Sequence, residues 1–116
     1  MITIAGSSRY KIDKKKVKSG IGEWMNKEKI YQEDFNVVLV GKKKMRDLTD
    51  KYKKDGVLHP VLSFDLQNNT NTLPDSVRGE VFICYPQAIL LASERNKRAD
   101  DMIVELIKHG ISSIMS

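Results

Sequence analysis

The sequence contains little cysteine, since Cys84 is the only one among 116 residues. No disulfide can form within the chain, and a single cysteine after the apolar residues 81–83 is typical of a buried strand in a reducing compartment. The sequence also lacks an apolar run of the roughly 18 to 20 residues that a membrane-spanning helix needs, and residues 1–11 do not have the pattern of a signal peptide. We therefore expect a cytoplasmic protein with no membrane partner.

Several motifs that carry chemistry are absent. There is no glycine-rich phosphate loop and no CxxC pair, and the only histidines are His59 and His109. Nucleotide hydrolysis, Ser/His/Asp chemistry and a zinc finger therefore have no support in the sequence. Aromatic residues make up only 7 % of the chain, so stacking on nucleic acid bases is not strongly indicated.

Positive charge is what the sequence has in excess, with a net charge of +5 and a pI near 9.3. The densest basic stretch covers residues 42–54, and such a stretch is either a solvated helix face or a surface that binds polyanions such as RNA. The candidate phosphate-binding residues are Lys42, Lys43, Lys44, Lys53, Lys54 and Arg78.

Hydrophobic periodicity predicts a strand–helix–strand–helix–strand–strand–helix–helix order. The expected strands cover residues 2–5, 35–40, 57–64 and 79–84, and the apolar stripes of the expected helices cover residues 17–25, 45–52, 88–92 and 103–114. With 116 residues the chain is expected to form one domain, residues 1–116. The predicted fold class is α+β, with about four strands in a mixed sheet packed against four helices.

Particular residues refine this prediction. Asp13 is expected to cap the first helix, and Pro60 to place the third strand at a sheet edge or bulge. Tyr52 is expected in the core, and the apolar run 88–92 to be covered on more than one side. On the last helix, His109 and Met102 are expected opposite the core stripe. The polar stretch 67–78 is expected to be a mobile or functional loop.

Four short segments occur in an order and spacing that resemble one protein family. They are LTDKYK at 48–53, VLSF at 61–64, RGEVFIC at 78–84 and HG at 109–110. Together they resemble the YbeY family of endoribonucleases, which mature ribosomal RNA. The resemblance implies a YbeY-like fold, cleavage of single-stranded RNA in ribosome biogenesis, a three-histidine zinc site, and partners among ribosomal RNA and small ribosomal subunit proteins.

The match is incomplete at the implied zinc site. The first family histidine corresponds to His109, but the second position is Ser113 and the third would fall beyond Ser116. Because one imidazole cannot hold a catalytic zinc, no metal cofactor is predicted. The family arginine after the tyrosine is Lys53, which lacks the bidentate guanidinium fork, and a Thr-Asp pair is replaced by residues 59–60.

Several interpretations remain open. His109 could act as a metal-free acid or base, with Lys53 facing the developing phosphate charge, or it could be a residue left after metal binding was lost. A rebuilt metal site would need His59 or Cys84 as substitute ligands. The preferred function is a YbeY-like endoribonuclease with a degenerate metal site. The alternatives are an RNA- or ribosome-binding protein without catalysis, and a structural homologue that binds a protein partner.

Overall fold

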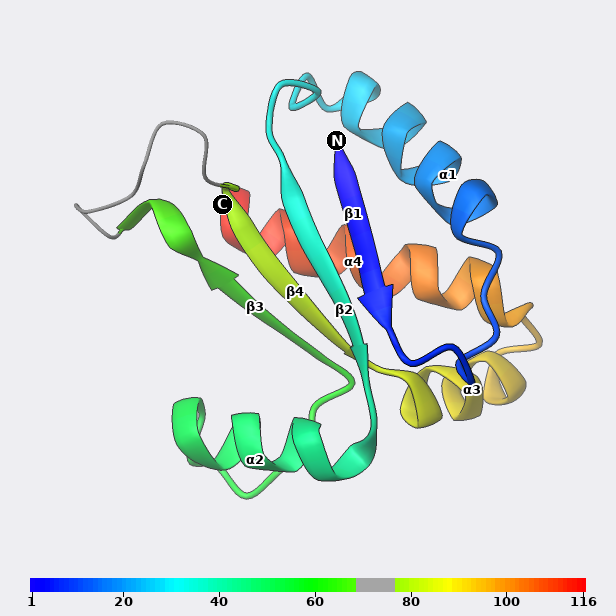
Figure 1. Cartoon of the computed structure of the whole chain (residues 1–116), viewed down its shortest axis with the longest axis vertical. Coiled ribbons are helices and arrows are strands. Elements are labelled where there is room, and N and C mark those ends of the chain that lie inside the picture. The colour runs from blue at the N-terminus through cyan, green and yellow to red at the C-terminus, as the bar shows by residue number, and fades with distance from the viewer. Residues whose placement is uncertain (69–76) are drawn as a thin grey trace.

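A four-stranded sheet in the order β1-β2-β4-β3 organises the computed structural model, which describes residues 1–68 and 77–116 (Figure 1). The strands are β1 (Ile2–Gly6), β2 (Phe35–Val40), β3 (Val61–Asp65) and β4 (Gly79–Cys84). The helices are α1 (Lys14–Lys27), α2 (Lys42–Tyr52), α3 (Tyr85–Glu94) and α4 (Ala99–Met115), with a short 3₁₀ turn η1 (Leu66–Asn68) after β3. Strand β2 is parallel to β1 and β4, whereas β3 is antiparallel to β4. The predicted α+β class, with a mixed sheet and four helices in the described ranges, is confirmed.

Alternation along the strands gives the sheet two different faces. Val37, Val81 and Ile83 contribute to the larger core, which α1, α3 and α4 complete. On the other face, Leu62 and Cys84 pack with Met45 of α2 in a smaller core. Figure 1 shows α4 running behind the strands and α2 at the end of the sheet where β2 finishes. Helices α2 and α4 therefore lie on opposite faces of the sheet.

Several predictions about individual residues and strands are confirmed. The Asp13 carboxylate accepts a hydrogen bond from the backbone N–H of Lys16 at 3.1 Å, which is the geometry of an N-cap. Strand β2 is central, β3 is at the edge, and Cys84 is fully buried, all as predicted. No helix among residues 1–68 and 77–116 has both the length and the apolar character needed to cross a membrane.

Two burial predictions were wrong. Met102 is fully buried because α4 packs against α1, α3 and the sheet, so more than one stripe of this helix is covered. Tyr52 is 53 % exposed because the buried face of α2 consists of Met45 and Thr49, and Tyr52 is not part of that face. On α3, only Ala88 and Ala92 are buried.

Two segments also differ from expectation. Leu90 is 58 % exposed, so the apolar run 88–92 is covered on one side only. The third strand begins at Val61, after Pro60 and not at residue 57, since proline has no N–H to donate to a ladder. Most of the predicted loop 67–78 lies outside the described residues, namely residues 69–76.

Candidate functional site

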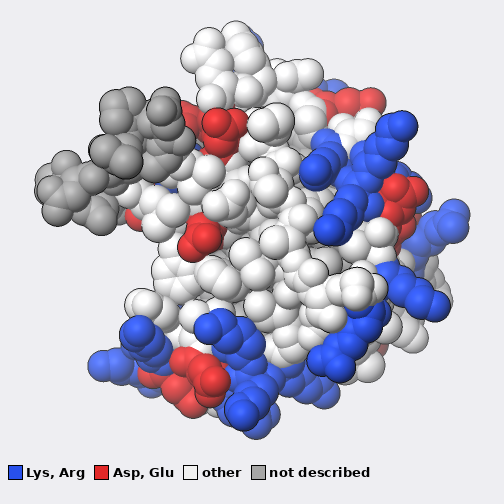
Figure 2. All heavy atoms as spheres, in the orientation of Figure 1, with Lys and Arg blue, Asp and Glu red and all other residues white. Residues whose placement is uncertain are grey.

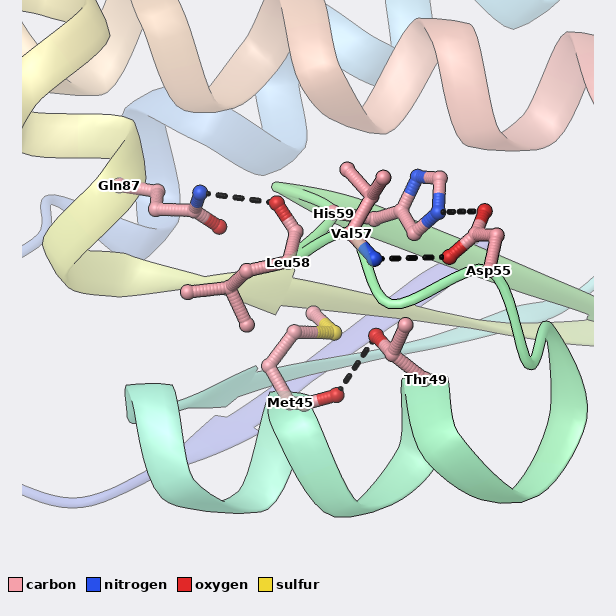
Figure 3. Close-up of polar contacts among 7 residues, drawn as sticks. All are labelled: Met45, Thr49, Asp55, Val57, Leu58, His59 and Gln87. Atoms are coloured by element: carbon pink, nitrogen blue, oxygen red, sulfur yellow. Dashed lines mark hydrogen bonds and ion pairs between the residues drawn. The ribbon is translucent and has the colours of Figure 1, made fainter.

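The connection between α2 and β3 is held in place by its own hydrogen bonds. The backbone N–H groups of Lys53 and Lys54 both donate to the carbonyl of Thr49, at 2.8 and 2.9 Å, which ends α2. The buried Thr49 hydroxyl donates to the carbonyl of Met45 at 2.8 Å (Figure 3). Further along, the side-chain amide of Gln87 donates to the carbonyl of Leu58 at 3.0 Å and so ties the connection to α3.

Asp55 orients His59 within this connection. Its carboxylate accepts a hydrogen bond from the backbone N–H of Val57 at 3.0 Å and lies 2.7 Å from Nε2 of His59 (Figure 3). The Val57 N–H first, and the His59 ring second, lower the pKa of the Asp55 carboxyl. Figure 3 shows the second ring nitrogen of His59 on the edge that faces α4. An ionised carboxylate therefore fixes one side of the imidazole and leaves the other side available.

His59 and His109 line the same cavity, which has a volume of about 370 Å³. It lies where the start of β3 meets α3 and α4. Its lining residues are His59, Pro60, Val61, Leu91, Arg95, Met102, Glu105, Leu106 and His109. The His109 side chain is exposed at this surface, as predicted for a residue off the core stripe. The structure thus brings together the two histidines of the chain, which are 50 positions apart in the sequence.

Gly110 explains how closely α4 approaches the sheet beside His109. A Cβ atom at this position would lie 2.6 Å from a Val81 methyl carbon and 2.9 Å from the Ser63 hydroxyl oxygen. Only a residue without a side chain fits there without displacement of the helix. The HG pair therefore combines an exposed imidazole with the close contact that sets the helix against β3 and β4.

The cavity lining carries two charged residues of opposite sign, Arg95 and Glu105. Glu105 forms ion pairs with Arg95, at 3.8 Å, and with Lys97. The hydrogen bond from Lys97, more than any other cause, lowers the pKa of the Glu105 carboxyl. Two cations therefore hold the Glu105 carboxylate, and Asp55 adds a second carboxylate beside His59, so the charges of these four side chains balance.

The residues present do not form the three-ligand zinc site that the family resemblance implies. Nε2 of His59 already faces Asp55, and Glu105 is held by two cations. Cys84 is buried in the smaller core, away from the cavity lining, and burial raises the pKa of its thiol. Across residues 1–68 and 77–116, no three His, Cys, Asp or Glu side chains are grouped so that they could hold a metal ion.

Helix α2 and the residues that follow it form a second surface, which we call the basic surface. Its basic side chains, all exposed, are Lys42, Lys43, Lys44, Arg46, Lys51, Lys53 and Lys54. With only Asp47 and Asp50 as acidic neighbours, residues 42–54 carry a net charge of +5, equal to that of the whole chain. Figure 2 shows this charge gathered at the α2 end of the molecule, with more basic side chains along the α1 side.

The other predicted site residues are placed differently. Lys53 stands at the end of α2, on the opposite face of the sheet from α4, and does not line the cavity with His109. Arg78 is 21 % exposed at its side chain and faces Asp65 at 3.4 Å and Glu33 at 3.8 Å. Its guanidinium is therefore already engaged by carboxylates.

Three aromatic rings lie beside the basic surface. Tyr52 contacts Phe64 edge-on with centroids 4.9 Å apart, and Phe64 contacts Phe82 in the same manner at 5.6 Å. The Lys51 ammonium lies 5.3 Å from the centre of the Tyr52 ring. These rings come from α2, β3 and β4, so only the tertiary fold brings them together. The low aromatic content of the whole chain therefore did not predict this local cluster.

Comparison with known proteins places these features in a family context. The family model described as Endoribonuclease YbeY matches residues 3–115. An Endoribonuclease YbeY from Phytoplasma australiense is 34 % identical over 77 residues, which cover 66 % of this chain and 54 % of that protein. The protein of the same name from Thermotoga neapolitana is 28 % identical over 111 residues, covering 96 % and 69 % respectively.

A solved structure is also similar. The solution structure of a Thermotoga maritima protein superposes with a TM-score of 0.63 at 25 % identity, covering 96 % of this chain and 69 % of that one. The chain thus spans about half of the phytoplasma relative and about two thirds of the two Thermotoga proteins.

Proposed function

Since this chain belongs to the YbeY family, whose model matches residues 3–115, we propose that it is an endoribonuclease that cleaves single-stranded RNA. The observation that carries the proposal is the position of His109. This histidine of the family motif lines a cavity that also holds His59, Arg95 and Glu105. From the end of the basic surface at Lys54, the chain reaches His59 in five residues. RNA bound along α2 would therefore have a short path to the cavity.

The preference for single strands follows from the basic surface and its aromatic neighbours. Lysines bind phosphates without regard to sequence, and unpaired bases stack on exposed aromatic rings. Tyr52 is exposed and contacts both Lys51 and Phe64. A duplex would keep its bases stacked on each other and could not use this ring.

The finer functional assignment follows the family. We propose ribosomal RNA as the substrate, ribosome biogenesis as the process, small ribosomal subunit proteins as further partners, and the cytoplasm as the location. We also propose that the metal site is degenerate, because Ser113 occupies the second ligand position and Cys84 is buried outside the cavity. His109 is the proposed catalytic residue. The six basic residues named from the sequence are the proposed RNA contacts, and Arg78 would have to exchange its partners Asp65 and Glu33 for a phosphate.

Cleavage of a mixed-sequence single-stranded RNA tests this proposal. The wild-type protein and His109→Ala should be purified identically, together with Lys15→Ala, which changes an exposed lysine of α1. We expect cleavage by wild type and Lys15→Ala and its loss in His109→Ala. Equal cleavage by all three proteins would identify a contaminating nuclease and contradict the proposal.

A non-enzymatic RNA-binding protein is the alternative. It is favoured by one observation, the lack of a three-ligand metal group in the described part of the chain. In that case RNA would bind to the basic surface without being cut. RNA binding at low salt together with no cleavage by the wild-type protein would establish this alternative.

A further inference from the structure

The geometry of the cavity points to a two-histidine catalytic site, and we propose that His59, oriented by Asp55, and His109 together cleave RNA by transesterification at the 2′-hydroxyl. The inference rests on the proposed endoribonuclease function and specifies its chemistry. It replaces the metal-dependent chemistry that the family resemblance implies, for which the described residues supply no ligand set.

The first observation is the Asp55–His59 pair. In the neutral ring, one nitrogen carries a proton and the other accepts one. The 2.7 Å contact between Nε2 and the Asp55 carboxylate fixes the proton at Nε2, because an ionised carboxylate only accepts hydrogen bonds. Nδ1 is then the basic nitrogen, on the ring edge that faces α4 in Figure 3. This arrangement of carboxylate and imidazole prepares a general base.

The second observation is that His109 lines the same cavity from α4. Cleavage at a 2′-hydroxyl needs one group that removes a proton and another that donates a proton to the leaving oxygen. Two imidazoles from different parts of the chain that line one cavity can supply these two groups. The cavity volume of about 370 Å³ lies within the range of ligand-binding clefts, roughly 300–1,000 Å³.

The third observation is that an arginine lines the cavity. Arg95 lines it, and the Glu105 carboxylate is shared between Arg95 and Lys97. The guanidinium of Arg95 has further N–H donors besides the one that faces Glu105, and these can face the phosphoryl oxygens, on which negative charge increases in the transition state. The apolar side chains of Val61, Leu91 and Leu106 complete the wall of the cavity.

The proposed step is balanced in atoms and protons. His59 takes the proton of the 2′-hydroxyl, whose oxygen attacks the adjacent phosphorus and forms the new P–O2′ bond. The P–O5′ bond breaks, and protonated His109 donates its proton to the departing 5′-oxygen. The products are a 2′,3′-cyclic phosphate and a 5′-hydroxyl. The proton has moved from His109 to His59 in net terms, and exchange with water restores the starting state.

The ends of the cleaved RNA test the inference. Single-stranded RNA is treated with the wild-type protein, His59→Ala, His109→Ala and the control Lys15→Ala, with and without EDTA. We expect cyclic phosphate and 5′-hydroxyl ends, no effect of EDTA, and no cutting where the nucleotide at the mapped site is 2′-deoxy. Each histidine variant should be slowed by about 100-fold or more, the usual contribution of a general acid or base. Added imidazole should restore part of the activity of His59→Ala, which a purely structural role would not allow.

Other outcomes separate this inference from the function on which it rests. RNA products with 5′-phosphate ends, or full activity in His59→Ala, would overturn the two-histidine site while the endoribonuclease proposal stands. No cleavage by wild type would overturn both. Circular dichroism of the variants, which change one partly exposed and one exposed side chain, confirms that each is folded before its rate is compared.

Discussion

At the scale of single residues, function here depends on close contacts as much as on reactive groups. His109 is exposed, and nothing in its own side chain fixes its position. The next residue, Gly110, is buried against Val81 and Ser63, where an added methyl group would overlap with both. The glycine therefore fixes the distance between α4 and the sheet. This distance in turn sets the position of His109.

Gly110→Ala should lower the free energy of unfolding by about 1–3 kcal/mol, as overpacking of a core does. Alanine is intrinsically the better helix former by about 1 kcal/mol, so helix propensity alone would stabilise this variant. A loss of stability therefore indicates the overlap of the added methyl group with Val81 and Ser63. Gly22→Ala is the matched control, because a Cβ atom there meets nothing within 4 Å. Urea unfolding should show that Gly22→Ala is stabilised by about 0.5–1 kcal/mol. Equal stabilisation of both variants would contradict the described contact.

The Asp55 carboxyl should titrate below the usual range of aspartate, and NMR of its carboxyl carbon measures this pKa. The Val57 N–H is the main cause and His59 the second, so His59→Ala should raise this pKa only part of the way. Because the folded-state pKa is depressed, the associated stability is present above the unfolded pKa and lost as the pH falls through the folded value. An unchanged Asp55 pKa in His59→Ala would show that the pair does not form in solution.

At this scale, structure was predictable from the sequence where one residue and its neighbours decide the outcome. Asp13 as a cap and Cys84 as a buried strand residue are of this kind. Met102 and Tyr52 were assigned wrongly because burial depends on which elements pack against a helix, and a single helical stripe does not contain that information.

At the scale of elements, α2 combines a weak helix start with a dense row of exposed basic side chains. Lys42, Lys43 and Lys44 occupy its first turn, where the helix dipole favours acidic side chains, and Gly41 provides no side-chain cap. Helix α2 is therefore less stable than a helix of the same length with acidic residues in its first turn and a side-chain cap. A charge arrangement that opposes helix formation is consistent with selection for an anionic partner.

Replacement of Lys42, Lys43 and Lys44 by alanine should consequently have two opposite effects. The slope of log affinity for single-stranded RNA against log salt should fall by about 2, since each lost contact on a single strand contributes about 0.7. The free energy of unfolding should rise by about 1 kcal/mol as the unfavourable dipole interaction is removed.

The matched control replaces Lys14, Lys15 and Lys18, which are exposed on α1. Fluorescence anisotropy over a series of salt concentrations measures the slope, and urea unfolding measures the stability. If the slope of log affinity against log salt fell equally in the α1 and α2 variants, RNA binding would depend on the charge of the whole molecule and not on the basic surface.

At the scale of the whole molecule, the sheet separates the basic surface from the cavity, and the α2–β3 connection joins them around its edge. Because β3 is the edge strand, residues 53–60 pass from the α2 face to the α4 side within a short distance. The order of elements was predictable from hydrophobic periodicity. The cavity was not predictable from the sequence, because His59, Arg95 and His109 belong to three segments with no shared local pattern.

The most direct test of this arrangement is an NMR titration of the ¹⁵N-labelled protein with single-stranded RNA at low salt, using the His109→Ala variant, in which the proposed mechanism predicts that the RNA stays intact. The account predicts that the largest amide shifts occur at the end of α2, along residues 53–59 and around position 109, with little change in α1. Shifts confined to α1, or shifts at α2 that never extend to His59 and position 109, would contradict a single RNA path from the basic surface to the cavity.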